Sequence, residues 1–267
     1  GDRQLKFLAA WSEDWVGVRH KAVLSASAFC GAVHMHGGKD SRLLADLDCN
    51  GWPQSGRNEA LRSLRRVQSV HLYGDQHLAV TVKHGIEAFG DGPYSLTSPA
   101  LVNTIYGRWW HPKDENAGPN AVVGSPLPWT GDFLDGLGNK MSVVAYANPG
   151  DVQDERQRAD GYGVARFQMA KQSVTFECWP RFSDSRKGDG EQFPGWPQTF
   201  VLADNDGRKP TGFLPTIDLS AEGDRAVVQV IHEQTGETVY VRRLKGVKEF
   251  APPVFAAGTY VVKVGVD

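Results

Sequence analysis

The chain has 267 residues, of which 40% are hydrophobic, and its formal net charge is −2. The apolar content excludes a disordered chain, and Gly and Pro, together about 17% of the residues against a usual ~12%, exclude a coiled coil or a helical bundle. Because Lys and Arg are balanced by Asp and Glu, bulk charge provides no basic field to hold nucleic acid or an anionic membrane. The length allows one or two domains.

The first third of the chain predicts alternating helices and strands. Apolar residues recur at helical spacing over residues 2–15, and residues 21–29 are rich in small apolar side chains, as expected of a strand covered on both faces. Helical spacing returns over residues 55–67, and a short strand follows at 69–73. The order strand, helix, strand indicates a parallel crossover and therefore an α/β fold.

The rest of the chain predicts irregular structure and then antiparallel strands. Residues 98–138 are broken by many Pro and Gly, and a hairpin is expected over 163–179. Four further β-like segments are expected at 199–202, 226–232, 238–244 and 259–266. The predicted organisation is a first domain over 1–182, a polar linker over 183–197 and a small β-sandwich module over 198–267.

Several classes of protein lack support in the sequence. The longest stretch without charge near the start, residues 22–38, carries Ser and His and is no transmembrane span, and no targeting signal opens the chain. Cys30, Cys49 and Cys178 are too few for a disulfide scaffold and are not spaced as a zinc site. A Walker loop, a dinucleotide fingerprint and a nucleophile elbow are all missing.

The tetrapeptide Gly74-Asp75-Gln76-His77 directly follows the predicted strand 69–73. Open α/β sheets bind ligands at the carboxyl ends of their strands, so this turn is a candidate site. An Asp and a His two residues apart can face one cavity, and a carboxylate with an imidazole suits Zn, Mn or Fe. The alternative is a strand-ending Gly-Asp turn whose His is polar surface.

Two other clusters have both a functional and a structural interpretation. His34-Met35-His36 places two imidazoles on one face of a strand, with Asp46 and Asp48 a short loop away, which would suit a metal. Trp109-Trp110, with Trp129 beyond, would stack on sugar rings or bind a partner if exposed. The alternative for these tryptophans is a loop anchored by its own aromatic side chains.

The run from Asp46 through Asn50-Gly51-Trp52 to Arg57, followed by a helix and a strand ending in Gly74-Asp75-Gln76-His77, resembles the distal half of alkaline phosphatase D-like metallophosphoesterases. The resemblance extends over residues 1 to about 180. It implies a calcineurin-like half-domain of mixed sheets with flanking helices, carrying a small all-β sandwich. It also implies hydrolysis of phosphate mono- or diesters with two metal ions, drawn from Fe, Zn, Mn and Ca.

The same resemblance assigns roles to five residues. His77 would be a metal ligand, and Asp75 would be a ligand or a partner that orients one, so both would be catalytic. Arg57 would hold phosphate oxygens, while Asn50 and Trp52 would line the substrate pocket.

One departure from the family shapes the prediction. The family draws its first Asp-x-His ligands from a half of the fold that precedes the helix at residue 2, and this chain does not contain that half. We therefore expect a complementary N-terminal segment or subunit, the chain being a cleavage product, an incompletely read chain or one part of a split protein. The family implies a periplasmic or extracellular location. The alternative function is a noncatalytic glycan- or protein-binding protein on a degenerate phosphatase scaffold.

Overall fold

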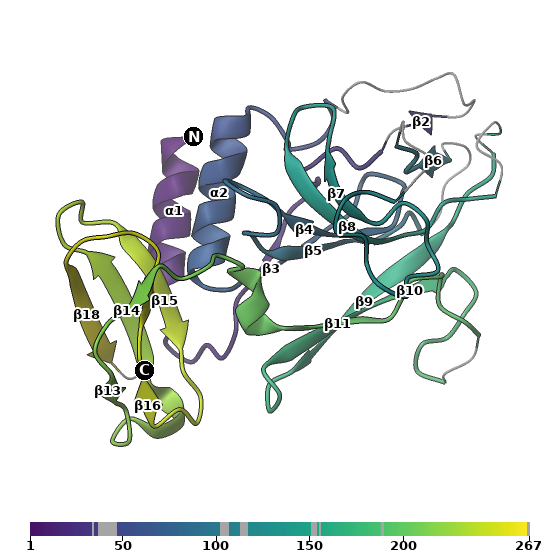
Figure 1. The fold of residues 1–267 in the computed structure, drawn as a ribbon. Helices are drawn as coiled ribbons and strands as arrows, with labels where there is room; N and C mark the ends of the chain where they lie inside the picture. The colour runs from purple at the N-terminus through teal and green to yellow at the C-terminus, as the bar shows by residue number, and fades with distance from the viewer. Residues whose placement is uncertain are drawn as a thin grey trace.

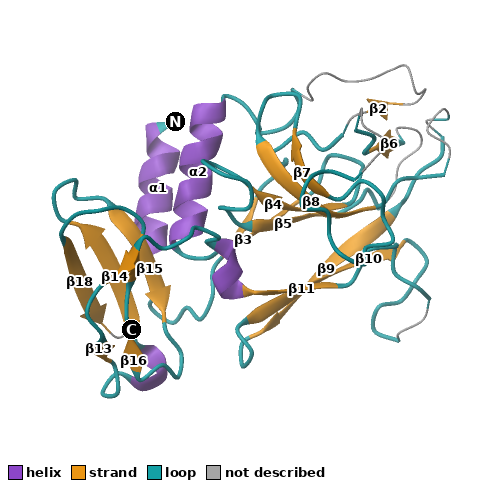
Figure 2. Ribbon diagram, in the orientation of Figure 1, coloured by secondary structure: helices purple, strands orange, loops and turns teal. Residues whose placement is uncertain are grey.

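The computed structural model of the chain is mostly strand, with two α-helices among the described residues (Figure 1; Figure 2). Helices α1 (Asp2–Glu13) and α2 (Gln54–Arg66) lie side by side, close to the predicted ranges. The structure describes residues 1–33, 47–101, 107–112, 117–150, 154, 156–187 and 190–265, together with the backbone of 35–36.

A six-stranded mixed sheet forms the centre of the molecule. Its order is β1 (Ala22–Leu24), β3 (Val70–Tyr73), β5 (Tyr94–Thr97), β4 (Val80–His84), β8 (Lys140–Tyr146) and β7 (Gly131–Leu134). Strands β1, β3 and β5 run parallel, and the remaining pairs are antiparallel. The predicted parallel crossover is confirmed, because α2 connects the β1 side of the sheet to β3. The α/β prediction thus holds for this part of a mostly β chain.

Strand β1 is shorter and less covered than the sequence predicts. It spans three residues where a strand over 21–29 is expected, and Leu24 is 79% exposed. Burial on both faces was the wrong expectation, because β1 is the edge of the sheet and no strand in the described ranges pairs with its outer side. An apolar run therefore marks this segment as a strand without revealing whether a neighbour covers it.

A second, three-stranded antiparallel sheet packs on the first. It contains β9 (Gly161–Gln168), β10 (Ser173–Pro180) and β11 (Gln198–Val201), which confirms the predicted hairpin. The core between the sheets contains Val70 and Leu96 from one side and Val174 and Phe176 from the other. The opposite face of the six-stranded sheet is also covered, so its central strands are buried on both sides.

Two segments lie elsewhere than the sequence suggests. Strand β11 was placed in the β tail, yet it pairs with β10 and so belongs to the sheet of the predicted first domain. The predicted linker 183–197 brings Trp196 into the core, where its Nε1 donates to Thr81 Oγ1 at 3.0 Å. Polar composition marked residues 183–190 as a linker, but the tryptophan beyond them anchors this segment to the sheet.

The C-terminal strands form the remaining part, which we call the β module (residues 212–265). Its main sheet has the order β15 (Thr238–Arg243), β14 (Val227–His232), β18 (Tyr260–Gly265). Two short pairs face it, β12 (Gly212–Phe213) with β17 (Pro253–Val254), and β13 (Ile217–Asp218) with β16 (Glu249–Phe250). Its own core contains Leu219, Val228, Val230 and Tyr240. The predicted small all-β unit is therefore present.

The β module docks on the C-terminal ends of the two helices (Figure 1). Trp15 and Val67 pack against Val241 of β15. Arg243 Nη2 donates to the Trp15 carbonyl at 2.8 Å, and Arg66 pairs with Glu237 at 3.1 Å. Apolar packing and polar contacts thus join the two parts.

The tryptophan pair in the irregular region is fully buried. Trp109 and Trp110 are each 0% exposed. Trp109 Nε1 donates to the Pro149 carbonyl at 3.1 Å, and Trp110 Nε1 donates to the Trp129 carbonyl at 2.8 Å. These side chains anchor the loop, as the structural interpretation predicted, and they offer no surface to a glycan or a protein.

Candidate functional site

The turn after β3 has an unusual backbone. Asp75 and His77 adopt φ values of +72° and +53°, the left-handed region that side chains other than Gly seldom occupy. Between them Gln76 is buried, and its Oε1 accepts no hydrogen bond from the described residues. Strained residues of this kind persist where the surrounding structure holds them, and they concentrate at functional sites.

The carboxyl ends of β1 and β3 meet at this turn. Ser27, just after β1, donates its Oγ proton to Asp75 Oδ2 at 3.1 Å. Asn50 lies on the same side, since its Nδ2 approaches the Ser27 carbonyl at 3.5 Å and its backbone N–H donates to the Ala28 carbonyl at 2.7 Å. The fold therefore brings Asp75 and Asn50 to Ser27 at the ends of parallel strands where α/β sheets place ligands, and His77 follows Asp75 by two residues.

A buried histidine lies beneath the site. His71, in the middle of β3, is 0% exposed, and its Nε2 is 2.6 Å from Ser25 Oγ. Burial lowers the pKa of His71 to about 3, so the imidazole is neutral at physiological pH. Ser25 also donates toward the Ser27 carbonyl at 2.8 Å, which links the buried histidine to the serine that contacts Asp75.

Three of the five predicted site residues line one cavity of about 480 Å³. Asn50, Trp52 and Arg57 border it together with the N-terminal turns of α1 and α2. Trp52 is 53% exposed, and its Nε1 donates to the Leu47 carbonyl at 2.9 Å. Trp52 and Asn50 are therefore placed to contact a ligand, although Asp75 and His77 do not border this cavity.

Arg57 does not have the environment of a phosphate ligand. It is 4% exposed, and its guanidinium donates to the backbone carbonyls of Phe29 (Nε, 2.8 Å), Gly85 (Nη1, 2.6 Å) and Lys140 (Nη2, 3.3 Å). A further bond joins Nη1 to Asn58 Oδ1 at 2.9 Å. The substrate-binding role predicted for Arg57 is corrected to a structural one, because the fork already satisfies buried carbonyls of three separate segments.

The other predicted metal cluster mostly lies outside the described residues. His34 and Asp46 are not described, and Met35 and His36 are described only as the backbone of β2 (Met35–His36), paired with β6 (Arg108–Trp109). Within the part of the chain that the structure describes, no group of three or more His, Cys, Asp or Glu side chains is arranged to hold a metal ion. Asp75 and His77 thus supply at most two ligands.

Two residues of the site were not predicted from the sequence. The sequence assigned no site role to Ser25 and Ser27, yet they connect His71 and Asp75 at the ends of adjacent strands. Their position in the sequence could have indicated this role. Ser25 and Ser27 follow β1 as Asp75 and His77 follow β3, and neighbouring parallel strands end at the same edge of a sheet.

Comparisons with known proteins return no matching family model, no matching curated protein and no matching solved structure. Among the helices in the described ranges, none has the length and apolar character needed to cross a membrane.

Proposed function

We propose that this chain is part of a metal-dependent phosphoesterase that hydrolyses phosphate mono- or diesters. The observation that carries the proposal is the left-handed turn Asp75–His77 at the carboxyl end of β3, joined through Ser27 to the end of β1. The likeness of residues 1 to about 180 to alkaline phosphatase D-like enzymes supports it, and a calcineurin-like arrangement is part of the same proposal.

The chemistry of the turn suits such an enzyme. Asp75 offers a carboxylate and His77 an imidazole, the donor types that Zn, Mn and Fe accept. Ser27, by donating to one oxygen of Asp75, would hold that carboxylate in one orientation. Two metal ions, when bound, would clamp the phosphate and lower the pKa of an attacking water.

A complementary polypeptide segment is part of the proposal. Each metal ion needs about four ligands or more, and the described residues offer Asp75 and His77. The outer edge of β1, with Leu24 exposed, would accept a further strand beside the site. The intact mass of the natural protein or complex is therefore expected to exceed the 29.3 kDa of this chain.

The test measures metal content and activity of the natural protein, with p-nitrophenyl phosphate as the monoester and bis-p-nitrophenyl phosphate as the diester. His77→Ala is expected to remove bound metal and to reduce hydrolysis to the level of the EDTA-treated protein, because a ligand is lost. Ser27→Ala is expected to weaken metal affinity by roughly 10-fold, since it frees the Asp75 carboxylate without removing a ligand.

Thr175→Ala serves as the control. Its hydroxyl bonds to Thr199 on the second sheet, and we expect it to leave metal content and activity unchanged. Unchanged metal content and activity in His77→Ala would contradict the proposed function.

A noncatalytic binding role receives no support from the tryptophans on which it depended. Trp109 and Trp110 are core residues, so the surface for a glycan or a protein partner would have to lie elsewhere.

A further inference from the structure

A continuous set of hydrogen bonds leads from the buried His71 to the exposed Asp75 carboxylate. His71 Nε2 lies 2.6 Å from Ser25 Oγ, and Ser25 Oγ lies 2.8 Å from the Ser27 carbonyl oxygen. Ser27 Oγ then lies 3.1 Å from Asp75 Oδ2. The path begins on β3, crosses to the two serines that follow β1, and returns to the turn after β3.

The donors and acceptors on this path fix the direction of each bond. Ser25 has one hydroxyl proton, and the Ser27 carbonyl can only accept, so that proton lies on the bond to Ser27. If Ser25 donated to His71 instead, two oxygens would face each other at 2.8 Å without a proton between them. His71 Nε2 is therefore the donor to Ser25 Oγ.

The same argument assigns the tautomer of His71. A neutral imidazole carries one proton, and this proton is on Nε2, so Nδ1 is unprotonated. Nδ1 has no hydrogen-bond partner among the described residues, and the assignment leaves no N–H buried there without an acceptor. The tautomer also excludes Ser25 as a nucleophile activated by His71, because a general base has to accept the serine proton.

The imidazole is packed among other rings. Its centroid lies 4.3 Å from that of Phe29 and 4.8 Å from that of Tyr73, and His71 is 0% exposed. Interiors are close-packed, so a side chain in these surroundings has little freedom to turn. The Nε2–H donor thus stays directed at Ser25.

Ser27 transmits this order to the surface. Its carbonyl accepts from Ser25 Oγ, and Asn50 Nδ2 approaches the same oxygen at 3.5 Å. Its hydroxyl donates to Asp75, an exposed residue in the left-handed turn. A carboxylate on the surface has several rotamers available, and a bond from a fixed hydroxyl selects one of them.

We propose that His71 is a positioning residue for the Asp75 carboxylate and acts through the Ser25 hydroxyl and Ser27. This inference rests on the proposed function in one respect, since it takes Asp75 as the carboxylate that binds a metal ion or orients a ligand. The hydrogen bonds themselves belong to the metal-free chain. Without the Nε2 donor, the Ser25 hydroxyl would turn, Ser27 would be released, and Asp75 would lose its preferred orientation.

The first test is NMR spectroscopy of the full chain at pH 7.5 with EDTA, which keeps metal out of the result. In the ¹⁵N spectrum of the histidine side chains we expect a protonated Nε2 and an unprotonated Nδ1 for His71, assigned by their loss in His71→Gln. The ¹³C signal of the Asp75 carboxyl carbon responds to hydrogen bonding. His71→Leu is expected to move this signal in the same direction as Ser27→Ala, and His71→Gln, which keeps a side-chain N–H donor, is expected to restore it.

Ser25→Ala breaks the same path without changing the buried ring, so it decides the question if His71→Leu does not fold. It is expected to move the Asp75 signal as His71→Leu does. In the natural protein each variant should weaken metal affinity by about 3- to 10-fold, since an indirect partner costs less than the roughly 10-fold of a direct one. The double variant should be no weaker than the weaker single variant, because both changes break one path.

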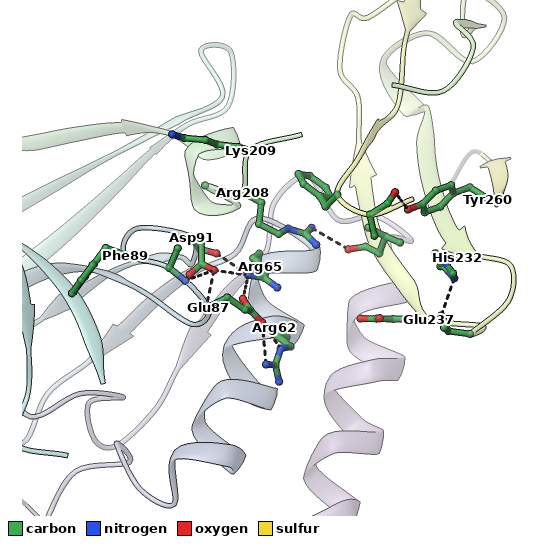
Figure 3. Close-up of a pocket in the computed structure, with 16 residues that line it drawn as sticks. Arg62, Arg65, Glu87, Phe89, Asp91, Arg208, Lys209, His232, Glu237 and Tyr260 are labelled. Atoms are coloured by element: carbon green, nitrogen blue, oxygen red, sulfur yellow. Dashed lines mark hydrogen bonds and ion pairs between the residues drawn. The ribbon is translucent and has the colours of Figure 1, made fainter. Parts of the chain in front are cut away.

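Two other histidines provide matched controls. His84→Leu removes a second imidazole that is 0% exposed, 5.9 Å from His71, and that has no hydrogen-bond partner among the described residues. His232→Leu removes another pair of imidazole and hydroxyl, in which His232 Nδ1 lies 3.2 Å from Thr235 Oγ1. This pair borders a cavity of about 770 Å³ between α2 and the β module, which shares no residue with the β3 turn (Figure 3). Neither control is expected to change the Asp75 signal or the metal affinity.

The proposal is overturned if His71 carries its proton on Nδ1, or if Ser25→Ala leaves the Asp75 signal in place. It is also overturned if His84→Leu moves that signal as far as His71→Leu does. A protein that binds no metal but shows the expected Asp75 shifts would contradict the proposed function and support the positioning role of His71.

Discussion

Replacing Arg57 by methionine is expected to lower the free energy of unfolding by about 2–6 kcal/mol. The variant would leave the carbonyls of Phe29 and Gly85 without this donor, at a cost of roughly 1–3 kcal/mol each, whereas the Lys140 carbonyl loses one bond but keeps the one from the Gly85 N–H at 2.9 Å. These carbonyls belong to the segment after β1, the end of β4 and the start of β8. Arg57→Met should therefore unfold at markedly lower urea concentration, as measured by circular dichroism.

Two comparison variants make this result specific. Arg57→Lys keeps the charge but loses the planar fork, so we expect an intermediate loss of about 2 kcal/mol. Arg62→Met removes a partly exposed arginine of the same helix, paired with Glu59 and Glu87, and should cost at most about 1 kcal/mol. A folded, stable Arg57→Met protein that had lost only phosphate affinity would contradict the structural role and restore the substrate-binding one.

Acidification is expected to destabilise the protein steeply below pH 6.5. His71 and His84 are both 0% exposed, and they lie 5.9 Å apart between ring centroids. Burial lowers the pKa of His71 to about 3. The pKa of His84 also falls well below its usual value, chiefly through burial and then through the nearby Arg57 charge. Both imidazoles are therefore neutral in the folded protein down to acidic pH.

The sign follows from the protons bound in each state. In the unfolded chain both histidines take up protons near pH 6.5, whereas in the folded chain they stay neutral until the pH approaches their lowered pKa values. Below pH 6.5 the unfolded state therefore binds more protons, and stability falls by about 1.4 kcal/mol per pH unit for a histidine that stays neutral in the folded protein. At pH 4.5 the loss from His71 alone is about 2.7 kcal/mol, and His84 adds to it in the same direction.

Urea denaturation at pH 7.5 and pH 5.0 measures this effect. His84→Leu is expected to reduce the loss between the two pH values, because the contribution of one of the two buried histidines is removed. It should cost little at pH 7.5, because neither ring nitrogen of His84 has a hydrogen-bond partner among the described residues. Val82→Ala, a buried change on the same strand without a titratable group, should lower stability equally at both pH values. An unchanged pH dependence in His84→Leu would show that other groups control acid stability.

Local pattern predicted the regular elements well where one sequence period dominated. The helices at 2–13 and 54–66, the parallel pairing of β1 with β3, and the β9–β10 hairpin all follow from spacing that short segments carry in themselves. The pattern was less informative at β1. Leu24 is an apolar residue of the kind found in cores, yet it lies on the edge strand of the sheet and is exposed. Whether a strand lies at the edge or in the centre of a sheet depends on its neighbours, and the sequence of a single strand does not specify them.

The candidate site was likewise predictable only in part. The position of Asp75 and His77 after a strand was readable from the sequence, and the structure joins Asp75 to Asn50 through Ser27. Arg57 was misassigned because an arginine at the start of a helix looks the same in sequence whether it faces a ligand or three buried carbonyls.

The sequence by itself determined a chain with too little excess charge for bulk electrostatic binding, a crossover of strand, helix and strand, and a polar turn at the end of the second strand. Tertiary structure alone decided that Arg57 is structural and that Trp109 and Trp110 are buried. The physical reason is that periodicity and turn chemistry act over a few residues. Burial and hydrogen-bond satisfaction depend on which distant segments meet, and only the folded chain brings those segments together.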